Sequence, residues 1–171
     1  MRERTGIITM HGNPLTLLGS EVKAGERAPE ATLLDNNLTP VKISSFRGKV
    51  VVISSVPSID TPVCDIETRR FNKEAEGLAK DVTILTVSMD LPFAQKRWCG
   101  AAGIERVTTL SDHLDASFGT SYGMLIKELR LLARAVFIVD RDGIVRYIQQ
   151  VRELTEEPDY DEIIKEIKKL A

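Results

Sequence analysis

The sequence predicts an α/β fold in which helices flank a mixed central sheet, with an extra β-hairpin at the N-terminus. Residues 50–53 form an uninterrupted β-branched run and residues 82–87 a second apolar run, and both predict strands buried on their two faces. A segment that suits a helix follows each of these runs. Buried strands that alternate with helices are typical of layered α/β domains.

The chain opens with the predicted hairpin. Apolar stretches at residues 6–10 and 15–18 flank His11-Gly12-Asn13-Pro14, whose composition predicts a turn. A polar loop follows over residues 19–29. Two short strands are then predicted on either side of the turn Asp35-Asn36-Asn37, at residues 31–34 and 41–43.

The two central helices are predicted after the buried runs. The first follows a loop at residues 54–62, and its apolar positions fall near helical spacing: Ile66, Phe71, Ala75, Leu78 and Ala79. The second is short, begins at Pro92 and carries Cys99, and Gly100 and Gly103 help to end it.

The C-terminal third completes the sheet and adds a last helix. A strand is predicted at residues 107–110, and a hairpin is predicted where residues 135–139 and 144–151 flank Asp140-Arg141-Asp142-Gly143. The last helix begins near Pro158, and one apolar stripe runs along it: Tyr160, Ile163, Ile164, Ile167 and Leu170. This order is consistent with a thioredoxin-like core preceded by the hairpin.

Length and composition narrow the classes of function. The 171 residues fit one domain over residues 1–171, with 43% hydrophobic and 28% charged residues, which are ordinary values for a globular protein. The net charge of −2 supplies no basic excess to hold a phosphate backbone, so no nucleic-acid partner is expected.

The sequence also restricts the expected cellular compartment and the expected metal or cofactor ligands. No apolar run reaches the roughly 18–20 residues of a membrane helix, and no secretory signal is recognisable, so we expect a cytoplasmic protein without a membrane partner. Two cysteines in the reducing cytoplasm are reactive more often than permanently bridged. Because His11 and His113 lack metal-ligand spacing with the cysteines, and no glycine-rich phosphate loop is present, no metal or cofactor is expected.

Cys64 is the first candidate for chemistry. Pro62 suits the first helical position, which makes Thr61 the N-cap and places Cys64 in the first turn. Free N–H groups and the positive end of the helix dipole favour an anionic sulfur there, and the thiolate is the nucleophilic form of cysteine. From position alone, a buried cysteine that acts as a small hydrophobe is equally compatible with the sequence.

Four ordered segments extend this pattern to a known family. The first is Pro57-Ser58-Ile59-Asp60-Thr61-Pro62-Val63-Cys64, which matches the active-site pattern of the peroxiredoxins. Together with three further segments, it resembles the thiol peroxidase subfamily of atypical two-cysteine peroxiredoxins over nearly the whole chain. These segments are Asp90-Leu91-Pro92-Phe93-Ala94-Gln95 leading to Cys99-Gly100, Leu132-Ala133-Arg134-Ala135, and Glu157-Pro158-Asp159-Tyr160.

The resemblance implies a catalytic role for five residues. Cys64 would attack a peroxide oxygen and become a sulfenic acid, and Cys99 would resolve it as a Cys64–Cys99 disulfide. Thr61 would hydrogen-bond the thiolate and the peroxide, and Pro57 would shield the site from water. Arg134, at the edge of a predicted strand, would stabilise the thiolate and orient the peroxide; without the resemblance, Arg130, Arg141 and Arg146 would be equal candidates.

The resemblance also implies substrates and partners. These are hydrogen peroxide and organic hydroperoxides, thioredoxin as the reductant, and a homodimer as the assembly. Two alternatives remain open: a peroxide-sensing redox module, and a structural protein with an inert Cys64–Cys99 bridge. Since two separate helices carry the cysteines, we expect the reduced state to hold the sulfurs apart and the segment 91–103 to unwind after oxidation.

Overall fold

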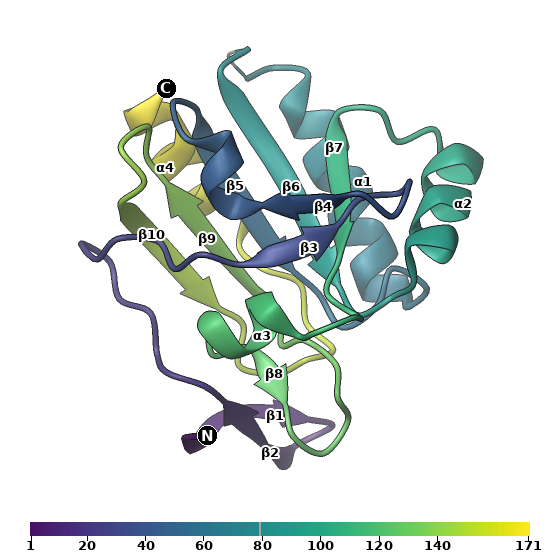
Figure 1. Cartoon of the computed structure of the whole chain (residues 1–171), viewed down its shortest axis with the longest axis vertical. Helices are drawn as coiled ribbons and strands as arrows, with labels where there is room; N and C mark the ends of the chain where they lie inside the picture. The colour runs from purple at the N-terminus through teal and green to yellow at the C-terminus, as the bar shows by residue number, and fades with distance from the viewer. Residues whose placement is uncertain (79) are drawn as a thin grey trace.

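A seven-stranded mixed sheet forms the centre of the computed structural model, which describes residues 1–78 and 80–171 (Figure 1). Strands β5, β6 and β7 are parallel, β9 is antiparallel to β5, and β10 is antiparallel to β9. In spatial order the strands are β10 (Val145–Gln150), β9 (Ala135–Val139), β5 (Val50–Ser55), β6 (Val82–Ser88), β7 (Val107–Ser111), β3 (Thr32–Leu34) and β4 (Pro40–Lys42). The predicted α/β class is confirmed.

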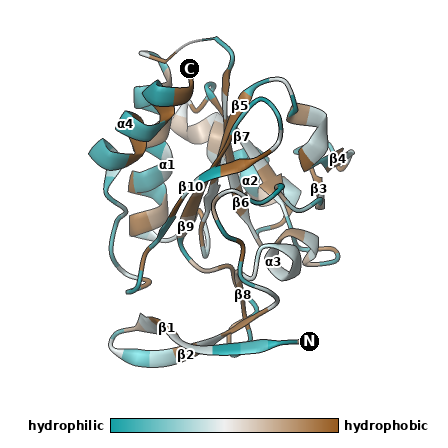
Figure 2. Cartoon of the chain, turned by 90° about the vertical axis from the view of Figure 1, so that its left-hand side faces the viewer, coloured by the Kyte–Doolittle hydropathy of each residue, from teal (hydrophilic) through white to brown (hydrophobic). Residues whose placement is uncertain are grey.

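Helices cover both faces of this sheet. They are α1 (Pro62–Ala75), α2 (Pro92–Ala102), α3 (Ser117–Ser121) and α4 (Tyr160–Leu170), with the 3-10 turn η1 at Ile43–Phe46. In Figure 2, α1 and α4 lie on one side of the sheet and α3 on the other. Strand β5 contributes Val50 and Val52 to the core beneath α1 and α4, and Val51 and Ile53 to the opposite core. Burial on both faces explains its uninterrupted β-branched run.

The predicted N-terminal hairpin is present as β1 (Glu3–Met10) and β2 (Asn13–Leu18), with His11 and Gly12 at positive φ in its turn. It pairs with the short β8 (Leu125–Ile126) as a separate three-stranded sheet, at the bottom of Figure 1. The Arg4 guanidinium donates to the Gly123 carbonyl at 2.6 Å and joins the hairpin to the main body.

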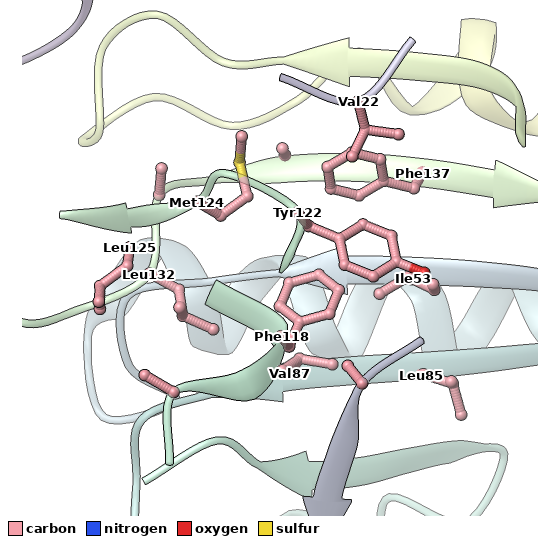
Figure 3. Packing of buried hydrophobic residues seen from close by; sticks show 14 of the residues in the cluster. Val22, Ile53, Leu85, Val87, Phe118, Tyr122, Met124, Leu125, Leu132 and Phe137 are labelled. Atoms are coloured by element: carbon pink, nitrogen blue, oxygen red, sulfur yellow. The ribbon is translucent and has the colours of Figure 1, made fainter. Parts of the chain in front are cut away.

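Strand β8 and helix α3 were not predicted. The Asp112 carboxylate accepts from the backbone N–H groups of Phe118 and Gly119 at 2.9 and 2.8 Å, which fixes the start of α3. Phe118 and Tyr122 then stack with ring centres 4.4 Å apart and pack against Phe137 of β9 (Figure 3). These long-range contacts hold a five-residue helix that its own sequence would not stabilise.

The predicted apolar face of α1 was wrong in one respect. Ile66 is 50% exposed, whereas Cys64, Glu67, Thr68 and Phe71 are the buried residues of the helix. These four positions follow the i, i+3, i+4, i+7 spacing of a single helical face, so the face is rotated from the expected one. The helix ends at Ala75 rather than continuing through Leu78, and Ala79 lies outside the described residues.

The other two predicted helices agree more closely with the structure. Helix α2 begins at Pro92 and ends at Ala102, with Gly103 as its C-cap in the left-handed conformation (φ 68°), while Gly100 lies inside the helix instead of ending it. Helix α4 begins at Tyr160 with Asp159 as its N-cap and buries Ile163 and Ile167. In the part of the chain that the structure describes, no helix is long and apolar enough to cross a membrane.

Candidate active site

The loop that connects β5 to α1 is anchored to the end of β6. Ser58 Oγ donates to Asp90 Oδ1 at 2.7 Å, and the Ile59 N–H donates to Asp90 Oδ2 at 2.9 Å. The hydroxyl of Ser88 donates to the same carboxylate at 2.6 Å. Since one carboxylate receives three donors, the loop that starts at the buried Pro57 has a defined path into α1.

Thr61 is the N-cap of α1, as predicted. Its side-chain oxygen accepts from the Cys64 N–H at 3.4 Å and its hydroxyl donates to the Ser58 carbonyl at 2.9 Å. Pro62 occupies the first helical position, and Cys64 lies in the first turn. The positive end of the helix dipole is therefore directed at the Cys64 region, and it favours an anion there.

The Cys64 side chain is 0% exposed, and Arg134 reaches it from the chain segment before β9. Burial alone would lower the pKa of Arg134, but the neighbouring Glu67 and Cys64 side chains and the hydrogen bond to Glu67 raise it. The guanidinium is thus a cation held next to the sulfur. Arg134 is not a solvent-exposed arginine at the end of a strand, because it is only 1% exposed. The other three candidate arginines are exposed, namely Arg130, Arg141 and Arg146.

Arg134 is fixed by several partners. Its Nε and Nη2 atoms donate to the Leu154 carbonyl at 3.1 and 3.0 Å. The backbone carbonyl of Arg134 accepts from the Val151 N–H and from Gln150 Nε2. These bonds hold the guanidinium in one orientation beside Glu67.

Glu67 completes the site and was missed in the sequence. Its Oε2 atom lies 2.6 Å from Arg134 Nη1, and Ser54 Oγ donates to its Oε1 at 3.1 Å. Complete burial raises the pKa of Glu67 to about 7, although the Arg134 charge and the hydrogen bonds from Arg134 and Ser54 act in the opposite direction. The signal was available: Glu67 is three residues after Cys64, on the same face of α1.

Cys99 lies apart from this group. It is half-buried on α2, and its sulfur is 3.5 Å from Thr109 Oγ1 on β7. Both cysteines are free in the structure. The neighbouring Trp98 donates from Nε1 to Asp65 Oδ1 on α1 at 2.8 Å. The structure therefore brings Pro57, Thr61 and Cys64 together on one loop and helix start, adds Arg134, and leaves Cys99 on another helix.

Among the described residues, 1–78 and 80–171, no group of three or more histidine, cysteine, aspartate and glutamate side chains is placed to hold a metal ion. The polar groups that surround Cys64 are instead paired with one another. Glu67 and Arg134 form an ion pair, and Thr68 Oγ1 donates to the Cys64 carbonyl at 2.8 Å. These pairs account for the polar side chains of Glu67, Arg134 and Thr68.

The raised pKa of Glu67 predicts a pH-dependent stability. Between about pH 4.5 and pH 7 the folded chain holds a proton on Glu67 that the unfolded chain has released. We therefore expect the free energy of unfolding of the wild type to fall, relative to that of Glu67→Gln, as the pH rises through this range. Urea unfolding of both reduced proteins at pH 5, 6, 7 and 8 measures this difference. If the free energies of unfolding of the two proteins change in parallel with pH, the pKa of Glu67 is not raised.

Comparisons with known proteins agree with the geometry. The Redoxin family matches residues 23–164 of the chain. The thiol peroxidase of Halalkalibacterium halodurans is 57% identical over 161 residues, which cover 94% of this chain and 96% of that protein. The thiol peroxidase of Bacillus subtilis is 55% identical over 164 residues, 96% of this chain and 98% of that protein.

Solved structures give the same result. A peroxiredoxin-like protein from Aquifex aeolicus superposes with a TM-score of 0.91 over 100% of both chains, at 44% identity. A thiol peroxidase from Chromobacterium violaceum shares the fold, with a TM-score of 0.84 over 95% of both chains at 19% identity. The chain therefore belongs to the Redoxin family and, within that family, to the thiol peroxidases.

Proposed function

We propose that this peroxidase uses Cys64 as its nucleophile. The Cys64 thiolate attacks one oxygen of a hydroperoxide, so that an S–O bond forms and the O–O bond breaks. The second oxygen leaves with the electron pair, takes up a proton and departs as water or an alcohol, and Cys64 becomes a sulfenic acid. The observation that carries this proposal is the buried sulfur of Cys64 in the first turn of α1, beside the Arg134 guanidinium.

The surrounding residues have distinct roles in this step. Arg134 stabilises the thiolate and orients the peroxide, because its planar fork of donors carries a permanent charge. Thr61 positions the first turn, because its side-chain oxygen accepts from the Cys64 N–H. Pro57, which is buried where the loop leaves β5, limits the access of water.

Cys99 resolves the sulfenic acid. The Cys99 thiolate attacks the Cys64 sulfur, an S–S bond forms, the S–O bond breaks, and the hydroxide released takes up a proton as water. The different exposure of the two cysteines supports this division of roles. A protein dithiol cannot reach the fully buried Cys64 sulfur, whereas Cys99 is partly exposed.

A dithiol protein closes the cycle by reducing the Cys64–Cys99 disulfide and becoming a disulfide itself. We assign this role to thioredoxin in the cytoplasm, with hydrogen peroxide and organic hydroperoxides as the substrates. Because thiols supply both electrons, the cycle needs no cofactor.

The assembly we propose is a homodimer. Three large apolar side chains on α1 and around the start of α2 are exposed and support it, namely Ile66, Leu91 and Phe93. If sedimentation equilibrium shows a monomer, the proposed homodimer is wrong.

Coupled turnover is the test of the proposed cycle. With thioredoxin, thioredoxin reductase and NADPH present, we expect many equivalents of hydrogen peroxide and of cumene hydroperoxide to be consumed per chain. Oxidation of NADPH, followed by the loss of its absorbance, measures turnover. Consumption of one equivalent would instead favour a peroxide-sensing module, and consumption of none would favour an inert Cys64–Cys99 bridge.

A further inference from the structure

Helices α1 and α2 are joined by three side chains, Asp65, Arg69 and Trp98, which we call the clasp. Trp98 Nε1 donates to Asp65 Oδ1 at 2.8 Å. Arg69 Nε lies 3.1 and 3.0 Å from the two oxygens of the same carboxylate. The Arg69 guanidinium also lies over the Trp98 ring, with Cζ 5.7 Å from the ring centre. The clasp thus combines an ion pair, a cation–π contact and a hydrogen bond to a charged acceptor.

The clasp residues are direct neighbours of both cysteines: Asp65 follows Cys64, and Trp98 precedes Cys99. Successive residues of an α-helix point about 100° apart around the helix axis. When Asp65 and Trp98 face each other, the two sulfurs therefore point elsewhere. Cys64 is directed into the core beside Arg134, and Cys99 is directed at Thr109 on β7.

No disulfide links the two cysteines in this arrangement. A disulfide requires Cβ atoms about 3.5–4.5 Å apart and directed toward each other. The side chains that face each other across α1 and α2 are instead Asp65 and Trp98. At least one helix must turn or unwind before the sulfurs meet, and this movement separates the Trp98 indole from the Asp65 carboxylate.

We propose that the clasp sets the rate of the Cys64–Cys99 disulfide step, an inference that rests on the proposed function. Asp65, Arg69 and Trp98 are positioning residues, because they act through the helices that carry the two sulfurs. A closed clasp keeps the Cys64 sulfenic acid in its pocket, where a second peroxide can oxidise it to a sulfinic acid and release water or an alcohol. An open clasp lets Cys99 attack first. Clasp strength therefore sets the balance between recycling and inactivation.

Trp98→Phe tests this proposal, because it keeps an aromatic ring but removes the N–H donor. We expect disulfide formation after one equivalent of hydrogen peroxide to become about tenfold faster, the change appropriate to a lost hydrogen bond to a charged acceptor. The peroxide concentration that converts half of Cys64 to the sulfinic acid should rise by about the same factor. Rapid acid quenching, thiol alkylation and mass spectrometry measure both quantities.

Arg69→Ala is the second test variant, and Arg97→Ala is its matched control. Arg69→Ala leaves the Trp98–Asp65 bond in place but removes the exposed cation, so we expect an acceleration of about threefold. Arg97 is exposed on α2 and lies outside the clasp, so its removal should not change the rate. Trp98 is the only tryptophan in the chain, and its fluorescence reports the opening of the clasp in both arginine variants.

The outcomes separate this inference from the proposed function. If the wild type forms no sulfenic acid at Cys64, the proposed function fails. If the sulfenic acid forms at its normal rate but the disulfide step is unchanged or slower in folded Trp98→Phe, the clasp proposal alone is overturned. Circular dichroism of the reduced variants shows whether they are folded. If Trp98→Phe does not fold, the rate of disulfide formation in Arg69→Ala tests the clasp proposal instead.

Discussion

The Cys64→Ser variant is expected to consume no hydroperoxide, because a serine hydroxyl cannot supply a comparable nucleophile at neutral pH. The substitution replaces one atom in a fully buried side chain, so the fold and the Glu67–Arg134 ion pair should survive. Thioredoxin-coupled NADPH oxidation, measured with hydrogen peroxide, tests this expectation. Sustained turnover by Cys64→Ser would overturn the assignment of the nucleophile.

Cys99→Ser is the matched partner of that variant, since it makes the same chemical change on α2. We expect it to reduce about one equivalent of hydroperoxide and then to accumulate sulfenic acid on Cys64, because the resolving thiol is missing. A dimedone adduct on Cys64, detected by mass spectrometry, identifies this product. Normal multiple turnover by Cys99→Ser would show that the reductant reaches Cys64 directly.

Arg134→Ala is expected to have the next largest effect. Loss of one preorganised charge-assisted contact at a reacting centre is worth roughly 2–4 kcal/mol, which corresponds to about 30- to 1,000-fold in the rate of peroxide reduction. The physical cause is the removal of the cation beside the buried sulfur. Stopped-flow measurement of sulfenic acid formation under single-turnover conditions isolates this step from recycling.

Controls separate the catalytic effect of Arg134 from a structural one. Arg146→Ala loses an exposed ion pair with Asp140 and should retain the wild-type rate. Arg134→Ala leaves the Glu67 carboxylate buried without its cation, which destabilises the fold, so the double variant Glu67→Gln/Arg134→Ala removes both charges. A folded double variant with the wild-type rate would contradict a role for Arg134 in the chemistry.

The region around Cys64 could be predicted because its structure is decided locally. Thr61 caps the helix and Pro62 starts it for reasons contained within four residues of sequence, and the structure confirms both. The strand at Val50–Ser55 was equally accessible, because burial on both faces demands a continuous apolar run. Neither feature depends on a distant partner.

Glu67 shows where such reasoning fails. Helical spacing alone placed Ile66 on the buried face of α1, and a carboxylate was not expected in the core. Glu67 is nevertheless completely buried, because Arg134, 67 residues away, supplies the compensating charge. That pairing exists only because β9 lies beside β5 in the sheet, and no pattern within α1 encodes this neighbour.

The sequence by itself determined the class of the fold, the N-terminal hairpin, the start of α1 and the candidate nucleophile, because propensity, capping and periodicity act over a few residues. Only the tertiary structure decided the Glu67–Arg134 pair beside Cys64 and the Trp98–Asp65 contact between the two cysteine-bearing helices. A buried charge or a buried hydrogen-bond donor costs free energy unless it is paired, and for Glu67 and Trp98 the partner lies on another element. Strand order and helix packing select that partner, and they are properties of the folded chain as a whole.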